Sequence, residues 1–144
     1  MSIKMNRNLV SARKAFFVAV VVIATSLCGT KSYAQEIVVD SVVSGITNMI
    51  AVGNADSLAT FFNQRVELSL PDYSIVSSRN QARMILRQFF AQNTPTEFNV
   101  LAQNEGQNGY FVSGMLNSGD TRYRVSFLTK EQSNQQVVYQ FTIE

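Results

Sequence analysis

Residues 53–72 read GNADSLATFFNQRVELSLPD and contain the change from helix to strand that decides the fold. Gly53-Asn54 can take the left-handed conformation that ends one helix. Asp56 is a suitable N-cap for a short second helix over 57–62. Between Arg65 and Leu70 apolar and polar residues alternate, which is typical of a half-buried strand. The stretch therefore predicts the corner between two helices and the strand that follows them.

Two longer helices flank this stretch. Apolar residues recur every three or four positions from Val39 to Ile50, which predicts a first helix with one buried face. Further along, Ser78 and Gln81 have the spacing of a capping box. They predict the start of a third helix over 79–92, which Pro95 prevents from continuing. The chain thus has three predicted helices, all in its N-terminal half and centre.

The remaining segments have the alternation and turn residues of strands. Pro71-Asp72 is a turn signal, and residues 73–77 follow it as a second short strand. In the last predicted strand we expect the apolar residues Val137, Tyr139, Phe141 and Ile143 to share one face. Polar or glycine-containing turns, including Asn108-Gly109, separate four strands in the C-terminal part. These four strands are predicted at 98–104, 110–116, 122–129 and 137–143.

Three helices and a run of strands joined by short turns predict an α+β fold. Successive strands with short connections form an antiparallel meander. The apolar stripes of the three helices would all pack on one concave face of a curved antiparallel sheet. A curved sheet closed by helices leaves a cavity at its open end, and concave sites of this kind bind small ligands.

The N-terminal segment has the order of a secretory signal peptide. Residues 1–14 carry four positive charges, and Ala15 to Leu27 form an apolar run of 13 residues. Ser32-Tyr33-Ala34 then supplies small residues at the two positions read by a signal peptidase. We expect cleavage between Ala34 and Gln35, which leaves one domain over 35–144. The apolar run is shorter than the about 20 residues of a membrane-spanning helix.

Composition excludes several classes of protein. The 144 residues include one cysteine and no histidine, which excludes a disulfide scaffold, a zinc finger and a histidine-based catalytic triad. Cys28 could accept a lipid anchor, but the bulky Leu27 before it departs from that pattern, so we expect Cys28 to be removed with the signal peptide. Without residues 1–34 the chain has 7 basic and 10 acidic residues, and 7 − 10 = −3. A net negative charge does not favour nucleic acid as a partner.

Four motifs resemble a family of exported bacterial proteins described as domain of unknown function 4783. They are G-N-A-x-x-L-A-x-x-F at 53–62, V-E-L-S-L-P at 66–71, F-F-A-x-N at 89–93 and Y-R-V at 123–125. The likeness extends over about residues 38–144. It implies the nuclear transport factor 2-like fold, a cone of curved sheet around helices. It implies no single activity, because this fold hosts enzymes, binding domains and adaptors.

Side chains that could serve catalysis are few. Some members of the wider fold are isomerases or dehydratases that use an acidic or histidine base with tyrosine or aspartate donors. The resemblance therefore makes three acids candidate bases, namely Glu67, Asp72 and Glu97, and three tyrosines candidate donors, namely Tyr73, Tyr123 and Tyr139. The alternative for the tyrosines is a core position whose hydroxyl reaches the rim. We assign no catalytic residue on this basis.

Aromatic residues on the predicted inner surface are the candidates for lining a ligand pocket. The set consists of Phe62, Tyr73, Phe89, Tyr123 and Tyr139. Packing of the core is the alternative role for Phe62 and Phe89. No phosphate-binding glycine loop, nucleophile elbow or cluster of metal ligands is present, so we expect no cofactor and no metal.

Arginines form two further groups. Arg79, Arg83 and Arg87 are spaced by four on the third predicted helix, where they either dock an anionic partner or form a solvated helix face. Arg122 and Arg124 alternate with Tyr123 and would leave the opposite side of the sheet. There they could pair with acids on a neighbouring strand.

The sequence leaves three functional hypotheses. The first is an exported, non-enzymatic domain of the cell envelope, periplasmic or secreted, that binds a small apolar ligand or an envelope protein. The second is a hydratase- or isomerase-like enzyme with a pocket carboxylate beside a tyrosine. The third is a structural module that forms a homodimer through the outer face of the sheet.

Overall fold

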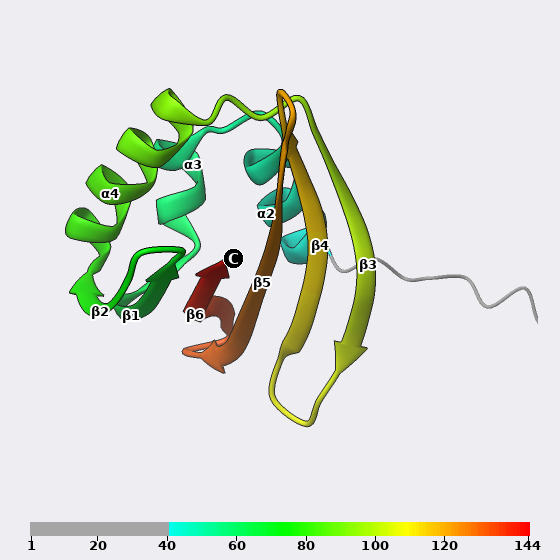
Figure 1. The fold of residues 1–144 in the computed structure, drawn as a ribbon. Coiled ribbons are helices and arrows are strands. Elements are labelled where there is room, and N and C mark those ends of the chain that lie inside the picture. Colours follow the sequence, from blue (N-terminus) through cyan, green and yellow to red (C-terminus); the bar gives the residue numbers. More distant parts are fainter. Residues whose placement is uncertain (1–40) are drawn as a thin grey trace, which may run out of the picture. The chain divides into compact units, whose positions relative to one another are not determined.

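The computed structural model describes residues 41–144, so the predicted signal peptide, Cys28 and the helix start at Val39 lie outside the described residues. Residues 41–144 form three helices and six strands in the order α2, α3, β1, β2, α4 and then β3 to β6 (Figure 1). The helices are α2 (Ser41–Ala51), α3 (Ala55–Thr60) and α4 (Arg79–Gln92). The strands are β1 (Phe62–Leu70), β2 (Tyr73–Ser78), β3 (Glu97–Glu105), β4 (Tyr110–Ser118), β5 (Thr121–Gln132) and β6 (Gln135–Ile143).

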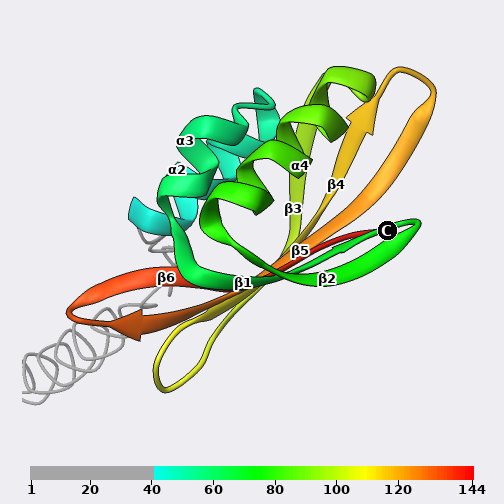
Figure 2. The ribbon, with the colours of Figure 1, turned by 90° about the vertical axis from the view of Figure 1, so that its left-hand side faces the viewer.

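The six strands form one curved sheet in the order β2-β1-β6-β5-β4-β3. The three helices lie on one face of this sheet, which we call the inner face (Figure 2). The predicted α+β fold with a curved sheet is confirmed, and so is the antiparallel meander from β3 to β6. The prediction of a fully antiparallel sheet is wrong for one pair, because β6 returns beside β1 and runs parallel to it.

The third helix forms as the sequence predicts. The side chain of Ser78 accepts a hydrogen bond from the backbone N–H of Gln81 at 3.3 Å, and Gln81 Oε1 accepts one from the Ser78 backbone at 3.1 Å. Both arms of the capping box are therefore present. At the other end, Asn93 caps α4 before Pro95. None of the helices among residues 41–144 is long and apolar enough to cross a membrane.

The second helix begins two residues earlier than predicted. Gly53 takes a φ of +66°, which ends α2, and Asn54 at once becomes the N-cap of α3. Asn54 Oδ1 accepts a hydrogen bond from the Ser57 N–H at 3.0 Å. The prediction of Asp56 as the N-cap is therefore wrong. As a consequence the helix also ends earlier, and Phe62 is the first residue of β1 rather than the last residue of a helix.

The interior of the cone is filled by the chain's own side chains. Each helix contributes an apolar stripe, with Ile46 of α2, Leu58 of α3 and Leu86 of α4 fully buried. Opposite them the sheet buries Phe127 and Phe141, whose stacked rings have centroids 6.4 Å apart. Three predicted apolar stripes thus meet in one core, whose burial drives the fold.

An irregularity between β5 and β6 changes which side chains face the core. Thr129 pairs with Val138, but Leu128 pairs with Gln140, so residue 139 is the extra residue of a β-bulge. Val138 and Phe141 are buried, and Tyr139 points to the outer face. The prediction that Tyr139 shares a face with Phe141 is therefore wrong. Strict alternation fails here because a bulge adds one residue to the count.

Candidate functional site

A pocket opens at the mouth of the cone, between the second half of α4 and the turn that joins β1 and β2. We call it the mouth pocket. Its volume is about 340 Å³, which lies at the lower end of the range for small-molecule sites. It is lined by Leu70, Pro71, Asp72, Tyr73, Ile85, Gln88, Phe89, Gln92, Asn93 and Tyr123.

The inner wall of the mouth pocket is apolar and well packed. Phe89 contacts Tyr123 edge to face, with ring centroids 5.2 Å apart, and it also contacts Phe90 at 5.8 Å. Leu70 and Ile85 are partly buried against the same core. Aromatic pairs of this geometry stabilise beyond their buried area. This wall is therefore a fixed apolar surface for a ligand to contact.

Hydrogen bonds hold the back of the mouth pocket in place. The Tyr123 hydroxyl donates to Asn93 Oδ1 at 2.7 Å. Asn93 Nδ2 in turn donates to the Phe89 carbonyl oxygen at 3.1 Å, and its backbone N–H donates to the same oxygen at 2.8 Å. The C-terminal cap of α4 thus positions the tyrosine hydroxyl, which is committed to this bond.

The rim of the mouth pocket offers polar groups that are not committed. Asp72, Tyr73, Gln88 and Gln92 are all exposed, and their side chains make no hydrogen bond or ion pair with other residues of the described domain. Such groups can bond to a ligand without first breaking a bond within the protein. The pocket therefore combines a fixed apolar wall with an available polar rim.

The structure brings three of the five predicted pocket residues together. Tyr73, Phe89 and Tyr123 line the mouth pocket. Phe62 is fully buried in the core, where its ring contacts Phe141, and it lines neither this pocket nor the outer one described below. Tyr139 lies on the other face of the sheet because of the bulge.

On the helical side of the mouth pocket, sequence reasoning predicted Phe89 but missed Ile85, Gln88 and Gln92. Ile85, Gln88, Phe89 and Gln92 follow the three- and four-residue spacing of one helix face, and all four line the pocket. Gln88 and Gln92 border the apolar stripe of α4. This spacing was visible in the sequence, but only the position of the β1–β2 turn shows that these two glutamines lie beside a pocket.

The three candidate acids are separated. Asp72 is the one acid among the residues that line the mouth pocket, and it is exposed. Glu67 pairs with Val76 across β1 and β2 and is exposed, and Glu97 accepts a hydrogen bond from Asn117 Nδ2 at 3.0 Å. No aspartate or glutamate is buried among residues 41–144. The acid at the mouth pocket, Asp72, therefore lies on the same lining as Tyr73 and Tyr123, but it is exposed to solvent rather than buried.

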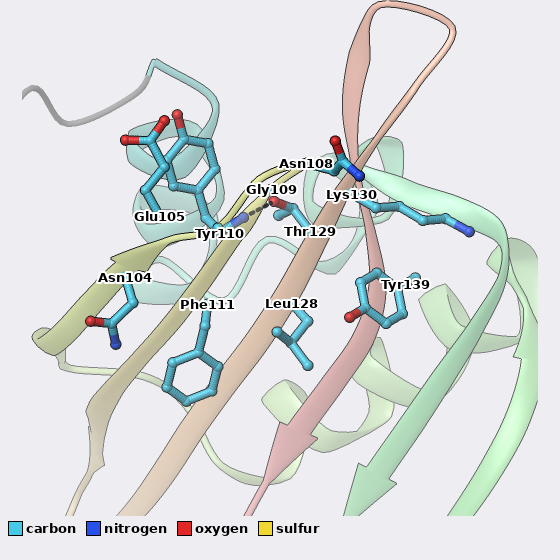
Figure 3. Close-up of a pocket in the computed structure, with 11 residues that line it drawn as sticks. Asn104, Glu105, Asn108, Gly109, Tyr110, Phe111, Leu128, Thr129, Lys130 and Tyr139 are labelled. Atoms are coloured by element: carbon cyan, nitrogen blue, oxygen red, sulfur yellow. Dashed lines mark hydrogen bonds between the residues drawn. The ribbon is translucent and has the colours of Figure 1, made fainter.

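A second depression, the outer pocket, lies on the face of the sheet that points away from the helices (Figure 3). Its volume is about 440 Å³. Phe111 of β4, Leu128 of β5 and Tyr139 of β6 lie side by side on three neighbouring strands. The Lys130 ammonium lies 5.6 Å from the centroid of the Tyr139 ring, within the range of a cation–π contact.

One edge of the outer pocket is held by the turn between β3 and β4. The Asn108 carbonyl oxygen accepts hydrogen bonds from Glu131 N at 2.7 Å and from Gln136 Nε2 at 3.4 Å. The Thr129 hydroxyl accepts from the Tyr110 N–H at 2.9 Å and donates to Gln136 Oε1 at 2.9 Å. These bonds join the β3–β4 and β5–β6 turns into one rigid border.

Two arginines of the predicted basic stripe are engaged with an acid. Arg87 hydrogen-bonds to the Asp56 carboxylate, and Arg83 Nε lies 3.8 Å from it. Asp56 therefore links α3 to α4 and neutralises part of the stripe, although exposed pairs of this kind contribute only about 0–1 kcal/mol. Arg122 and Arg124 stand opposite Asn117 and Met115 on β4. On its other side Arg124 stands opposite an acid, Glu144, with which it exchanges two backbone hydrogen bonds of 2.7 and 2.9 Å.

Within residues 41–144 no three His, Cys, Asp or Glu side chains come together as a metal site. The structure therefore assigns no residue of the described domain to a metal.

Comparisons with known proteins identify the fold. A DUF4783 family protein from Bacteroides ovatus is 25% identical, with a TM-score of 0.67 over 69% of this chain and 91% of that one. A DUF4783 family protein from Bacteroides uniformis is 24% identical, with a TM-score of 0.68 over 70% and 94%. An NTF2-like protein of unknown function from Cytophaga hutchinsonii is 10% identical, with a TM-score of 0.52 over 71% and 84%.

The fold is therefore nuclear transport factor 2-like, as the resemblance implied. A comparison with curated proteins finds no significant match. The family model described as a domain of unknown function, DUF4783, matches residues 43–144, which is most of the chain. The chain belongs to this family, domain of unknown function 4783.

Proposed function

We propose that this protein is an exported binding protein of the cell envelope that holds a small ligand in the mouth pocket without altering it chemically. The observation that carries the proposal is the mouth pocket itself. An apolar wall fixed by the Phe89–Tyr123 contact faces a rim of polar side chains without partners in the described domain. Pockets that bind small molecules combine apolar surface with polar groups that orient the ligand, and in the mouth pocket the polar share is the larger.

The lining indicates the chemistry of the ligand. Its apolar part would contact Ile85 and Phe89, and a hydrogen-bonding part would face Tyr73, Gln88 and Gln92. We therefore infer a small amphipathic molecule rather than the wholly apolar ligand expected from the sequence. The volume of about 340 Å³ restricts it to a compact molecule.

Binding is favoured over catalysis by the position of the acids. A hydratase- or isomerase-like reaction requires a base that is shielded from water and within hydrogen-bond reach of the substrate. Asp72 is exposed at the rim, and the Tyr123 hydroxyl is committed to Asn93. Neither group is therefore a shielded base, and no carboxylate among residues 41–144 is buried.

Export is tested separately from ligand binding. The full coding sequence is expressed in its own host, and the N-terminus of the protein in the envelope fraction is sequenced. We expect it to begin at Gln35, since Ala34 ends the small-x-small motif. A protein that keeps residues 1–34 and stays in the cytoplasmic fraction would contradict the envelope location.

Ligand binding is tested by native mass spectrometry of protein purified from that envelope fraction. We expect a non-covalent adduct of constant mass on the wild-type protein. Gln88→Trp places a bulky ring at the mouth pocket and should remove the adduct. Met84→Trp is the matched control, because Met84 lies one turn earlier on α4, is exposed and does not line the pocket.

Two results would contradict the binding proposal. One is a wild-type protein that carries no adduct in any preparation. The other is an adduct that Gln88→Trp retains in full, because a ligand at the mouth pocket cannot share that space with the new side chain. An adduct lost in Tyr139→Ala but kept in Gln88→Trp would assign the ligand to the outer pocket instead.

A further inference from the structure

One edge of the sheet is unprotected. β2 and β3 are the two edge strands, and each presents backbone N–H and C=O groups that pair with no neighbour in the sheet. The sequence of β2 is YSIVSS, without a charge or a proline, and it pairs with β1 without a bulge. Tyr73, Ile75 and Val76 are 48%, 42% and 61% exposed. In Figure 2 β2 is the foremost strand, and no helix or strand covers its free edge.

The opposite edge also exposes apolar side chains, but it is interrupted and carries charge. β3 contains a bulge between Val100 and Ala102, which interrupts the regular row of backbone groups. It also begins and ends with an acid, Glu97 and Glu105. Antiparallel pairing of two β3 strands would place these acids opposite each other, and like charges directly opposite destabilise a strand pair. Bulges and charges are the usual protection of edge strands, so β3 has what β2 lacks.

We propose that β2 pairs antiparallel with β2 of a second copy of this chain, so that one sheet continues through both molecules. Charge favours the antiparallel direction. Asp72 precedes the strand, whereas Arg79 follows it and Arg65 stands beside Ser78 on β1. Antiparallel alignment therefore places the acidic end of each strand beside the basic end of the other, and symmetry repeats the contact at both ends.

The side chains of β2 are compatible with this symmetry. A two-fold axis normal to the sheet keeps the inner faces of both copies on the same side, so residues of one face meet residues of the same face. Ile75 of β2 pairs with the buried Leu68 of β1 and belongs to the inner face, and Val76 belongs to the outer face. If the two-fold axis passes beside Ile75 or beside Val76, that residue stands directly opposite its own copy. Two exposed β-branched side chains then meet, which is a favourable cross-strand pair.

The size of the contact determines its strength. Six residues of backbone pairing make a narrow interface, well below the area of a permanent dimer. We therefore infer a weak, concentration-dependent association. This inference does not rest on the proposed function, because the pairing needs no ligand. The pairing would bring Arg79 of the second copy towards Asp72, which lies at the rim of the mouth pocket.

The test is sedimentation velocity from about 10 µM to about 1 mM protein, in the form purified from the envelope fraction. We expect the weight-average sedimentation coefficient of the wild type to rise with concentration. Val76→Lys should remove this rise, because a charge on an edge strand opposes pairing. Leu101→Lys on β3 is the matched control, since Leu101 is 63% exposed, and it should behave as the wild type.

Charge variants test the direction of the pairing. Asp72→Lys and Arg79→Glu should each reduce the association several-fold, and the double variant should restore it. Both residues are exposed, so the variants are expected to fold, which a thermal unfolding measurement checks. Failure of the double variant to restore association would overturn the antiparallel arrangement.

Two other results would overturn the pairing itself. One is a wild type that remains monomeric over the whole concentration range. The other is an association that Val76→Lys leaves unchanged and Leu128→Lys abolishes, because Leu128 lies on the outer face at the outer pocket. That result would assign the contact to the sheet face rather than to its edge.

Discussion

The two faces of the sheet differ sharply along a single strand, β5. On the inner face Val125, Phe127 and Thr129 are buried beneath the helices. On the outer face Leu128 is only partly buried, and Lys130 is exposed. The inner face therefore holds the apolar area that stabilises the domain. The rim, the outer face and the edges of the sheet lie outside this core.

The largest expected effect comes from alanine substitutions at two neighbouring residues of β5, one on each face. Phe127→Ala should lower the free energy of unfolding by about 3–5 kcal/mol, because it removes a buried ring and leaves a cavity. Leu128→Ala should lower it by about 1 kcal/mol, since a partly buried leucine loses only part of the full burial energy. Urea unfolding of both variants measures the difference.

Similar losses in Phe127→Ala and Leu128→Ala would contradict the comparison. They would indicate that the outer face is covered in solution, for example by a second molecule. Repeating the measurement at low and high protein concentration separates these cases, because only an intermolecular contact depends on concentration.

A smaller effect is expected from a substitution to alanine on each face of β4. A Cβ at Gly114 on the inner face would lie 2.5 Å from Phe98 Cζ and 2.6 Å from the Asn99 carbonyl oxygen. The backbone oxygen cannot rotate away, so Gly114→Ala should lower the free energy of unfolding by about 1–3 kcal/mol. Ser113→Ala, one residue away on the outer face, should change it by less than about 0.5 kcal/mol. Thermal and urea unfolding would both detect the contrast, and a neutral Gly114→Ala would contradict the close packing at this point.

The tyrosines on the two faces provide the next comparison. Tyr123→Phe removes the hydroxyl that donates to Asn93, and it should lower the free energy of unfolding by about 1 kcal/mol. Tyr139→Phe should have almost no effect, because its hydroxyl makes no hydrogen bond within residues 41–144. Equal effects of the two substitutions would show that the Tyr123–Asn93 bond does not hold the mouth pocket in place.

Local patterns predicted the elements whose signals are strong and short-range. The Ser78–Gln81 capping box and Pro95 bounded α4 correctly, because both act within one turn of the helix. The start of α3 was missed because Asn54 and Asp56 are both good caps. Only the positive φ of Gly53 selects Asn54.

Features that depend on distant strands could not be read from the sequence. The bulge at Tyr139 shows itself only when β5 and β6 are paired residue by residue. The parallel β1–β6 contact joins two strands about 70 residues apart in the chain, so local turns say nothing about it. Tyr139 was assigned to the wrong face because the bulge was not predicted. Tyr73, Phe89 and Tyr123 were proposed as pocket residues, and all three line the mouth pocket.

The smallest predicted effect is a gain in stability, whereas most substitutions of buried residues cause a loss. Ser77 on the inner face of β2 is 2% exposed, and its hydroxyl has no hydrogen-bond partner in the described domain. A buried hydroxyl without a partner keeps its desolvation penalty in the folded state. Ser77→Ala should therefore raise the free energy of unfolding, by about 0.5–1 kcal/mol.

Ser74 on the outer face of the same strand is the control for Ser77→Ala. Its hydroxyl bonds to that of Ser69 at 2.6 Å, so Ser74→Ala should lower the free energy of unfolding by about 0.5 kcal/mol. Opposite signs for two serine-to-alanine changes three residues apart cannot arise from β-sheet propensity, because the residue types exchanged are identical. A loss of stability in Ser77→Ala would mean that its hydroxyl bonds to a buried water molecule. The inner face would then be less dry than its packing indicates.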